Sequence, residues 1–471
     1  MRVVVEKPSS HSRSLSVPAP VTPPQELLDM KMPLPSFETF KSNLDLPLTP
    51  VTPPPEYKEH SFCHDQKALG VPPVVDCNDQ PLVAVIGVGY VGTHLVESFS
   101  AHYNVLGFDV SERRISEIRE ELPSDRIRFT TCKTDLLEAT HFLISVPTLL
   151  KADKSIDTSY LQSAIATVAQ HARPGSTVVV ESSVAVGMTR SLLGPVAVSH
   201  GFYAGMSPER VDPGRVEPPC HAIPKIVSGL DDIIPGSLSS IMRLYNQVFD
   251  RLVPVSRTEV AEMMKLYENC QRMMCIAFAN EMADACIPHG IDPYEVAAAA
   301  SSKPFGYMPF TPSLGVGGHC IPVNPYYLLS NSAFPLLESA AEKMSARPAM
   351  IARRAIESLA REAKAGAATA HLRPRILVVG VGFKAGQSVL SNSPGVDLVH
   401  ALAGSGDVDV MFADPLVKQN AVPAATRLAD ERWNRETLET FDMIIVSCRQ
   451  TGLDFDVLEQ LRGVKVEMWC T

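Results

Sequence analysis

The chain has 471 residues, of which 45% are hydrophobic and 20% charged, and its formal net charge is −10 at pH 7. This composition is typical of a globular protein with two or three domains. The acidic balance argues against nucleic acid as a main partner, because phosphate binding depends on clustered Lys and Arg. No apolar run is long enough to span a bilayer, and the ten cysteines include no CxxC pair, which argues against a structural zinc site. We therefore expect no membrane, nucleic-acid or metal partner. Scattered free thiols and the lack of a secretory signal predict a cytoplasmic protein.

Residues 1–80 contain 14 of the 39 prolines of the chain. Proline fixes φ and removes a backbone donor, so regular structure is disfavoured and a disordered Pro-rich tail is predicted. The pairs Thr22-Pro23, Thr49-Pro50 and Thr52-Pro53 are either phosphorylation sites or inert spacer. Spacer is favoured, because such dipeptides are common in any Pro-rich segment.

Short apolar runs recur along the next part of the chain and predict buried strands over residues 82–86, 103–108, 141–146 and 176–180. A helix is predicted after the first run, through Val96. Strands that alternate with helical patterns indicate a doubly wound α/β domain, with bounds of 81–258.

The middle of the chain is predicted to be helical. Residues 259–286 contain no Gly or Pro, and residues 334–365 also favour helix, with a kink or break at Pro348. Apolar runs over 375–380, 407–412 and 442–447 then restart the α/β rhythm. The predicted fold class is therefore α/β, with a central helical domain over 259–370 and a C-terminal Rossmann-like domain over 371–471. The second α/β unit is read as a degenerate copy of the first.

A dinucleotide fingerprint follows the first predicted strand: Gly87-Val88-Gly89-Tyr90-Val91-Gly92. Its glycines let a pyrophosphate approach the N-terminus of the next helix. Asp109 ends the second strand, where a carboxylate accepts hydrogen bonds from both ribose hydroxyls and repels a 2′-phosphate, so NAD is predicted as the cofactor. Arg114 is read either as an adenine contact or as a solvated helix residue. The alternative for the glycine pattern is a tight turn that binds no nucleotide.

A second motif places one cysteine behind a run of glycines: Gly315-Val316-Gly317-Gly318-His319-Cys320-Ile321-Pro322-Val323-Asn324-Pro325. Glycine lets the main chain approach a ligand closely, and a thiol held there can attack a carbonyl carbon. A nicotinamide cofactor and a nucleophilic Cys320 together suggest oxidation past the aldehyde to an acid. The alternative is that Cys320 is a small core residue.

Taken in order, the motifs of residues 81–471 resemble the UDP-glucose/GDP-mannose dehydrogenase family. Besides the two motifs above, the resemblance rests on Val146-Pro147-Thr148, Glu181-Ser182-Ser183-Val184, Ser207-Pro208-Glu209-Arg210, Pro213-Gly214, Pro224-Lys225-Ile226-Val227, Lys265 with Asn269, Gly382-Phe383-Lys384 and Ser393-Pro394. The motif GGHCIPV most resembles that of the branch that oxidises UDP-N-acetylhexosamines, such as UDP-N-acetylmannosamine or UDP-N-acetylglucosamine.

The resemblance implies an NAD-dependent four-electron oxidation of the C6 alcohol of a nucleotide sugar. Cys320 would be the nucleophile, held first in a thiohemiacetal and then in a thioester. Lys265 and Asn269, four residues apart and on one face of a helix, would hold the developing oxyanion and a bound water. A homodimer or larger homo-oligomer would form through the long central helices.

The same resemblance assigns the remaining site residues. Thr148 would lie beside the nicotinamide. Glu181 and Glu209 are the candidate carboxylates for the catalytic water and for general base work, in roles that the sequence does not separate, and a salt bridge to a nearby arginine is the alternative for Glu209. Lys384, after Phe383, would contact the phosphates of the substrate. The implied substrate-binding set is Glu209, Lys265, Asn269, Gly317, Phe383 and Lys384. The cofactor set consists of the glycine turn with Asp109, Arg114, Thr148 and Glu181.

The chain departs from the family pattern at three places. Asn324, placed with the catalytic set, stands where the family carries aspartate, and an amide cannot accept a proton. Val389 and Ser391 replace the Asp and Arg of a C-terminal motif, and the usual Asp-x-Arg ending is missing. These departures support an alternative, a catalytically weak relative that binds NAD or nucleotide sugar as a regulatory protein. A two-electron hydroxyacid dehydrogenase, which would not need Cys320, is a third interpretation.

Overall fold

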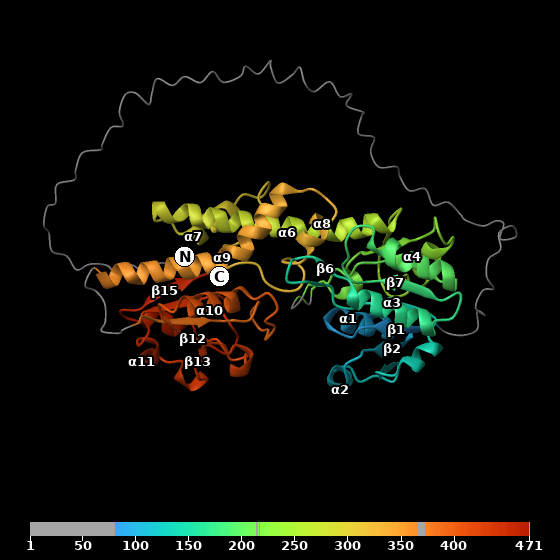
Figure 1. The fold of residues 1–471 in the computed structure, drawn as a ribbon, viewed down its shortest axis with the longest axis horizontal. Helices are drawn as coiled ribbons and strands as arrows, with labels where there is room; N and C mark the ends of the chain where they lie inside the picture. The colour runs from blue at the N-terminus through green and yellow to red at the C-terminus, as the bar shows by residue number, and fades with distance from the viewer. Residues whose placement is uncertain (1–80, 213–214, 216, 365–372, 471) are drawn as a thin grey trace, which may run out of the picture. The chain divides into compact units, whose positions relative to one another are not determined.

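A computed structural model of the chain describes residues 81–212, 215, 217–364 and 373–470. The predicted tail over 1–80, with its Thr-Pro pairs, lies outside the described residues, as does Pro213-Gly214. The described residues form two α/β units and a set of long helices (Figure 1), which confirms the predicted fold class.

The first α/β unit is built on an eight-stranded sheet with the strand order β10-β9-β8-β7-β4-β1-β2-β3. Neighbouring strands are parallel except β8 and β9, which are antiparallel. The strands are β1 Leu82–Ile86, β2 Asn104–Phe108, β3 Ile127–Thr130, β4 His141–Ile144, β7 Thr177–Val180, β8 Tyr203–Met206, β9 Lys225–Gly229 and β10 Leu252–Pro254. The connecting helices are α1 Tyr90–Ser100, α2 Glu112–Glu121, α3 Ser159–His171, α4 Met188–His200 and α5 Ser237–Tyr245.

Apolar packing on both faces explains this sheet. Val83, Ala84 and Val85 of β1 are fully buried, and alternate residues belong to two separate apolar clusters, one on each face. Strands buried on both faces are near-continuous apolar runs, which is why the sequence revealed them. β1 lies between β2 and β4, so the strand order reverses beside it, and ligands of such sheets bind at that switch point.

The segments between these strands add smaller elements that the sequence analysis did not predict. A hairpin of β5 and β6 pairs antiparallel after β4. These elements are η2 Lys133–Glu138, β5 Leu149–Leu150, β6 Ile156–Asp157 and η3 Cys220–Ala222.

The central region consists of helices, of which two are long. They are α6 Thr258–Cys286, η4 Ile287–His289, α7 Pro293–Ser301, α8 Asn324–Leu329 and α9 Pro335–Lys364. Of the kink or break predicted at Pro348, the break is wrong, because α9 continues through this residue. Proline removes the hydrogen bond to the carbonyl of Met344. The buried residues Met344 and Ile351 on either side keep the two halves packed in apolar clusters.

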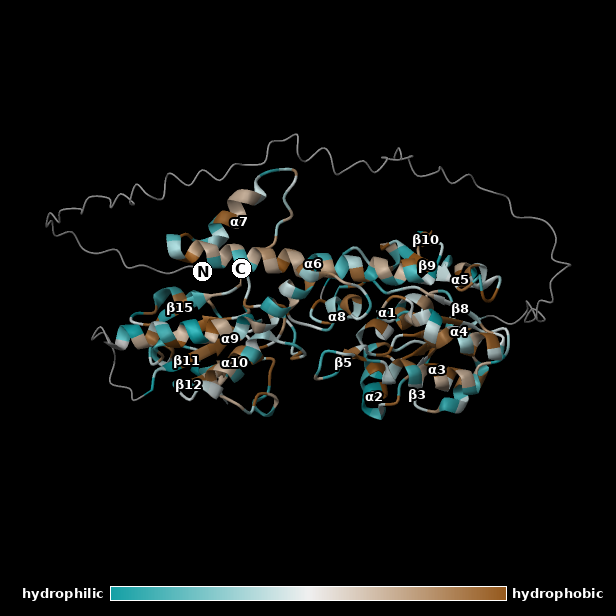
Figure 2. Cartoon of the chain, turned by 45° about the horizontal axis from the view of Figure 1, so that its top comes forward, coloured by the Kyte–Doolittle hydropathy of each residue, from teal (hydrophilic) through white to brown (hydrophobic). Residues whose placement is uncertain are grey.

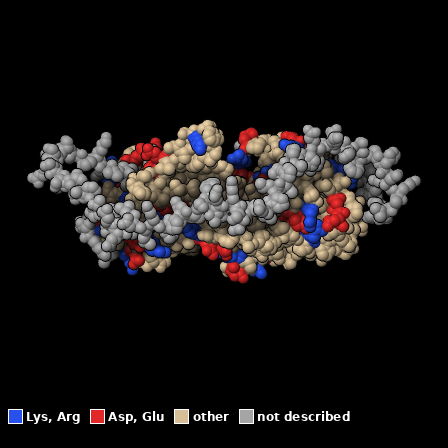
Figure 3. Space-filling model, turned by 90° about the horizontal axis from the view of Figure 1, so that it is seen from above, with Lys and Arg blue, Asp and Glu red and all other residues tan. Residues whose placement is uncertain are grey.

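The second α/β unit has five parallel strands in the order β13-β12-β11-β14-β15. Its elements are β11 Arg375–Val379, α10 Pro394–Ser405, β12 Asp409–Ala413, η5 Gln419–Ala421, β13 Thr426–Arg427, η6 Asp430–Arg432, α11 Arg435–Leu438, β14 Met443–Val446, η7 Asp456–Gln460 and β15 Lys465–Met468. Hydrophobic residues predominate in its strands and in much of α6 (Figure 2). Charged residues of both signs are interspersed on the face of the molecule seen in Figure 3.

Candidate active site

The turn after β1 has the geometry of a nucleotide-binding loop. Gly87 has φ +91°, which L side chains rarely adopt, and a Cβ on Gly92 of α1 would lie 1.9 Å from the carbonyl oxygen of Gly87. The two glycines therefore let α1 approach the end of β1 closely. A Cβ on Gly89 would meet nothing within 4 Å, so the space in front of the helix N-terminus is open.

Asp109 and Arg114 both bind this turn. Asp109 follows β2, and its carboxylate accepts hydrogen bonds from the N–H groups of Val88 at 3.1 Å and Ser111 at 2.9 Å while remaining half-exposed. Arg114 donates from Nε to the carbonyl of Val88 at 2.8 Å and from the other end of its guanidinium to Thr93 at 3.0 Å. Arg114 thus ties α2 to the turn, a role that neither sequence interpretation included.

These residues fit NAD. The open position at Gly89 leaves room for a pyrophosphate at the start of α1, where free N–H groups favour an anion. The half-exposed carboxylate of Asp109 keeps an oxygen available for ribose hydroxyls.

Cys320 lies at the end of the glycine-rich loop, four residues before the start of α8 at Asn324, and its side chain is exposed. The N–H of Asn324 donates to the Cys320 carbonyl at 2.9 Å, which fixes the loop against the helix. Gly318 has φ +89° and is buried, so the chain turns sharply just before the thiol. The cysteine is therefore not the core residue of the alternative interpretation.

Lys265 and Asn269 lie one turn apart on α6, and both are buried. Burial lowers the pKa of Lys265, while the nearby Cys320, Glu268 and Glu209 act in the opposite direction. Asn269 donates from Nδ2 to Oδ1 of the buried Asn324 at 2.6 Å. The structure therefore brings Cys320, Lys265, Asn269 and Asn324 together, although they lie up to 59 residues apart in the sequence.

The pair of amides shows what the departure at Asn324 changes. An aspartate at this position would accept the same hydrogen bond from Asn269, so the amide preserves the contact and loses the charge. Tyr327, one turn further along α8, makes a hydrogen bond with Thr148 after β4. Thr148 is therefore linked to the helix that also carries Asn324.

Glu181 and Glu209 share a buried lysine. Lys225 donates from Nζ to Glu181 at 2.7 Å and to Glu209 at 2.6 Å. Glu209 also accepts from the N–H groups of Arg210 and Val211, at 2.6 and 3.0 Å. Glu209 does form a salt bridge, as the alternative interpretation proposed, but with a lysine from β9 and not with an arginine.

The two glutamates have different proton affinities. Burial raises the pKa of Glu181 to about 7, because it outweighs the nearby Lys225. Burial also acts to raise the pKa of Glu209, but Lys225 and two backbone N–H groups more than offset it and hold the value below the ordinary one. Tyr245 of α5, whose hydroxyl donates to Glu181, was not predicted from the sequence. Lys225 belongs to a motif of the resemblance, but no role was predicted for it.

Residues of the second α/β unit pack against the cysteine loop. A Cβ on Gly318 would lie 3.0 Å from the Phe383 ring, and Gly318 donates its N–H to the carbonyl of Ser391 at 3.2 Å. Asn392 donates from Nδ2 to the Gly318 carbonyl at 2.9 Å. The Nζ of Lys384 lies 3.7 Å from Oδ2 of Asp212. Ser391 thus binds the loop through its backbone, where an arginine side chain was expected from the resemblance.

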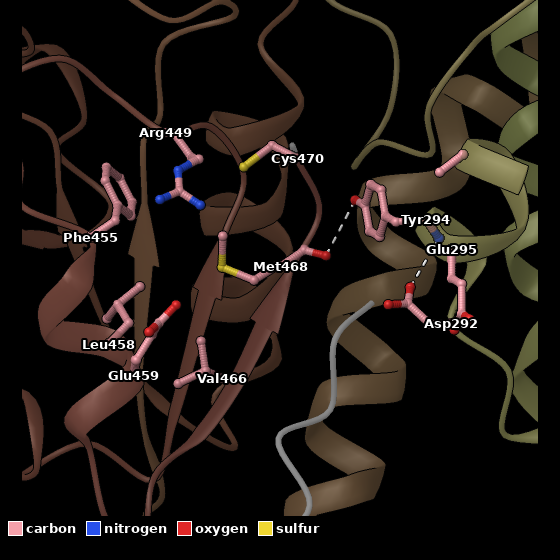
Figure 4. A pocket seen from close by; sticks show the side chains of 11 residues that line it. Asp292, Tyr294, Glu295, Arg449, Phe455, Leu458, Glu459, Val466, Met468 and Cys470 are labelled. Carbon is pink, nitrogen blue, oxygen red and sulfur yellow. Dashed lines mark hydrogen bonds between the residues drawn. The ribbon is translucent and has the colours of Figure 1, made fainter. Parts of the chain in front are cut away.

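Two cavities lie outside this constellation. One, of about 600 Å³, is bordered by the β5–β6 hairpin, by Val316 and Pro322 of the cysteine loop, and by Asn392. The other, of about 750 Å³, lies between α7 and the β15 side of the second sheet (Figure 4), where the Tyr294 hydroxyl donates to the Met468 carbonyl. None of the predicted site residues lines either cavity.

Within the described ranges, no group of three His, Cys, Asp or Glu side chains could hold a metal ion. In the same part of the chain, no helix is long and apolar enough to cross a bilayer.

Comparisons with known proteins agree with this geometry. The NAD-binding domain of the UDP-glucose/GDP-mannose dehydrogenase family matches residues 81–249, and the central domain of that family matches residues 259–342. The UDP-N-acetyl-D-glucosamine 6-dehydrogenase of Pseudomonas aeruginosa is 32% identical over 368 residues, which cover 71% of this chain and 83% of the relative. The UDP-N-acetyl-D-mannosamine dehydrogenase of Pyrococcus horikoshii is 31% identical over 364 residues, 71% of this chain and 84% of the relative.

A solved structure supports the same grouping. The UDP-D-ManNAc dehydrogenase structure from Pyrococcus horikoshii superposes with a TM-score of 0.71 at 27% identity, covering 82% of this chain and 99% of the other.

Proposed function

Because the chain belongs to the UDP-glucose/GDP-mannose dehydrogenase family, we propose that it oxidises the C6 alcohol of a UDP-N-acetylhexosamine to the carboxylate. The sugar class is supported by relatives named for UDP-N-acetylglucosamine and UDP-N-acetylmannosamine. The observation that carries the proposal is the convergence of an exposed Cys320 with buried Lys265 and Asn269. We also retain the domain bounds 81–258, 259–370 and 371–471 as part of the proposal.

The glycine turn and Asp109 would hold NAD, which supplies a hydride acceptor when bound. Two NAD molecules are needed for each sugar, because conversion of an alcohol to an acid removes four electrons and each NAD accepts two. Asp109 would accept hydrogen bonds from the ribose, and the start of α1 would bind the pyrophosphate. Thr148, between β4 and β5, would lie beside the nicotinamide.

Cys320 would keep the intermediate on the enzyme. After the first oxidation its sulfur adds to the aldehyde carbon, and the carbonyl oxygen takes a proton to complete a thiohemiacetal. Loss of a second hydride from that carbon, together with loss of the proton from its hydroxyl, leaves a thioester. Water then attacks the thioester carbon, the C–S bond breaks, and the sulfur leaves as thiolate, so that the new carboxylate oxygen comes from water. A covalently held aldehyde cannot escape between the two oxidations.

Lys265 and Asn269 would stabilise the negative oxygen that develops during each attack. An ammonium and an amide N–H in a buried setting are strong electrostatic partners, because little water competes with them. Asn324 would hold Asn269 in place through the 2.6 Å hydrogen bond. Gly317, Phe383 and Lys384 would contact the nucleotide sugar from the side of the second α/β unit.

The proposal is tested by counting NADH formed per sugar. Purified protein is given NAD with UDP-N-acetylglucosamine, UDP-N-acetylmannosamine, UDP-glucose or GDP-mannose in separate reactions. Two NADH per molecule of one UDP-N-acetylhexosamine support the proposal and name the sugar. Cys320→Ala should form no acid, whereas Cys132→Ala, a matched exposed cysteine outside the site, should match the parent chain. Acid formation by Cys320→Ala at the parent rate would contradict the thioester route.

Asn324→Asp tests whether the missing charge limits the rate. An aspartate would keep the bond from Asn269 and add a negative charge, which strengthens that bond. We expect a kcat change of about tenfold or less, because the contact geometry is the same in both forms. Activity that appears only in Asn324→Asp would support the alternative of a catalytically weak binding protein.

We further propose that two copies associate through α6. Its exposed apolar residues recur at helical spacing: Met263, Tyr267, Phe278 and Met282. Sedimentation of the parent chain should show a dimer or larger assembly, and Tyr267→Glu with Phe278→Glu should shift it toward monomer.

The described cysteines are all free thiols, which supports a reducing compartment such as the cytoplasm.

A further inference from the structure

Four side chains of the first α/β unit form a closed network beside the proposed site. Glu181 follows β7, Glu209 follows β8, Lys225 begins β9 and Tyr245 ends α5. Lys225 binds both carboxylates, and the Tyr245 hydroxyl binds the second oxygen of Glu181. All four are buried, with Glu209 the most exposed at 6%. Such a network has to balance its charge internally, because water cannot do so.

The charge count leaves room for one proton. Two carboxylates and one ammonium sum to a net charge of −1, and protonation of one carboxylate makes the network neutral. Burial favours the neutral arrangement. The question is therefore which of Glu181 and Glu209 carries the proton.

The hydrogen-bond donors around each carboxylate answer this question. Glu209 accepts from Lys225 and from the N–H groups of Arg210 and Val211. A backbone N–H can only donate, so two of them at one oxygen favour the ionised carboxylate. Glu181 accepts from Lys225 and from the Tyr245 hydroxyl, which can also rotate and accept. These donors therefore favour protonation of Glu181 and disfavour protonation of Glu209.

We propose that Lys225 is a positioning residue that fixes Glu209 as a permanent anion in the active site, while Glu181 carries the exchangeable proton of the network. This proposal rests on the proposed function for its catalytic meaning. It assigns Glu209 to orient water or the Lys265 ammonium by its charge, and it leaves Glu209 poorly suited to take up a proton. The pKa directions agree, since that of Glu181 is raised to about 7 and that of Glu209 is lowered.

Other titratable and charged groups that face the network come from the elements packed around it. Cys220 of η3 and Lys265 of α6 both feel the charge of Glu209, and the latter connects the network to the catalytic set. The Arg210 side chain is turned toward Glu268, and the Phe249 ring lies 5.2 Å from the Lys225 ammonium. None of these groups replaces the ammonium between the two carboxylates.

The first test compares the pH dependence of kcat in the parent chain, Lys225→Met and Lys225→Arg between about pH 5 and 9. Without the ammonium, the pKa of Glu209 rises. On acidification, kcat should therefore begin to fall at a higher pH than it does in the parent chain. We expect the acid limb of Lys225→Met to move up by about one pH unit or more, a tenfold relative loss at the acid end. Lys225→Arg keeps the charge and should keep the parental limb. A loss by the same factor at every pH would indicate a merely structural lysine and overturn the proposal.

Lys225→Met removes the cation between two buried carboxylates, which destabilises the folded protein. A second variant therefore keeps the test decisive. Lys225→Met with Glu181→Gln removes the ammonium and the carboxyl that carries the proton, and it leaves Glu209 as the one carboxylate of the network. Its acid limb should move in the same direction as that of Lys225→Met. An unchanged acid limb in this folded double variant would overturn the proposal.

A measurement without turnover separates this proposal from the proposed function. In protein labelled with ¹³C at the glutamate δ-carbon, Glu209→Gln and Glu181→Gln assign the two signals. The Glu181 signal should titrate near neutral pH, and the Glu209 signal should stay that of a carboxylate throughout the pH range in which Glu181 titrates. The reverse assignment would overturn the proposal. Parent protein that makes no NADH but shows the expected titration would refute the proposed function alone.

Discussion

The two α/β units repeat one local geometry and use it differently. β1 and β11 each run into a glycine with positive φ, Gly87 at +91° and Gly380 at +73°. Each of these glycines donates its N–H to the last residue of the neighbouring strand, at 2.8 Å to Phe108 and at 2.9 Å to Ala413. The second unit is therefore a structural copy of the first at this turn, as its sequence suggested only weakly.

The likeness extends to the neighbouring aspartate and to the helix. Asp109 follows β2 and Asp414 follows β12, and each accepts a hydrogen bond from the N–H of a turn residue, at 3.1 and 3.0 Å. A Cβ on Gly395 of α10 would lie 3.0 Å from the Gly380 carbonyl, as one on Gly92 would crowd Gly87. Both helices thus pack closely on the end of the first strand of their sheet.

The space above the turn is what differs. A Cβ on Gly89 would meet nothing within 4 Å, whereas one on Gly382 would lie 2.5 Å from the Gln387 carbonyl and 3.0 Å from the Gln450 amide. Gln450 is buried and donates to the carboxylate of Asp414. The second turn is filled by the chain itself. A strand, a glycine turn and an aspartate are therefore not sufficient for a nucleotide site, because the turn must also remain open.

Gly92→Ala should have the largest effect. Its Cβ would lie 1.9 Å from the Gly87 carbonyl, and a backbone atom cannot move aside cheaply, so α1 would shift off the turn. We expect NAD affinity to fall by about a hundredfold or more, roughly 3 kcal/mol, measured by calorimetric titration. Gly404→Ala in α10 is the matched control, because a Cβ there meets nothing within 4 Å. Unchanged NAD binding in Gly92→Ala would show that the first turn is not the cofactor site.

The two aspartates should respond in opposite ways to the same substitution. Asp109→Asn should weaken NAD binding about tenfold with little change in stability, because the amide still accepts from Val88 but binds ribose hydroxyls less strongly. Asp414→Asn should leave NAD binding unchanged and lower the free energy of unfolding by about 1–3 kcal/mol, because three donors converge on its buried carboxylate. Calorimetry and urea unfolding measure the two quantities. The same response in both variants would contradict the comparison.

Gln450→Ala tests whether the side chain of Gln450 alone keeps a nucleotide out of the second turn. The substitution removes hydrogen bonds with Gly386, Gln387 and Asp414 and should cost about 1–2 kcal/mol of unfolding free energy. The NAD stoichiometry should remain one per chain, because the Gln387 carbonyl still blocks the turn. A second bound NAD in calorimetry would mean that the side chain of Gln450 was the barrier.

The parts of the fold that the sequence predicted well are those set by local patterns. The strands β1, β2, β4, β7, β11, β12 and β14 are largely apolar runs that contribute to apolar clusters on both faces of their sheets, and α6 begins and ends within a residue of its prediction. Eight strands were missed. Four of them have only two or three residues, and others carry polar or charged residues such as Arg128, Lys225 and Glu467; the eight are β3, β5, β6, β8, β9, β10, β13 and β15. Their pairing depends on contacts far along the chain, which no local pattern contains.

The site divides in the same way. The glycine turn and the Cys320 loop are local motifs, so the sequence located them. The roles of Glu181 and Glu209 depend on Lys225, which reaches them from β9 by way of the antiparallel pairing of β8 and β9. The departure at Asn324 looked severe in the sequence, but its partner proved to be an amide that an asparagine also satisfies.

The attachment of each unit to α6 offers the smallest test. Glu259 at the start of α6 accepts from Arg190 of α4 at 2.5 Å, and this bond lowers the pKa of Glu259 to about 2. The lowered pKa means that the contribution to stability is complete above the unfolded pKa of about 4 and is lost as the pH falls toward 2. Since a fifth of the side chain is exposed to solvent, we expect Glu259→Gln to cost only about 1–2 kcal/mol near pH 7 and almost nothing near pH 2.

Urea unfolding of the parent chain and of Glu259→Gln at several pH values measures this difference. Glu281→Gln is the matched control, because its ion pair with Lys343 joins α6 to α9 and is about half exposed. Such an exposed pair should contribute little at any pH. If the stability difference for Glu259→Gln did not shrink on acidification, the bond to Arg190 would not be what holds the first unit to α6, and the attachment would rest on Glu262, which binds the N–H groups of Gly187 and Thr189 at the start of α4.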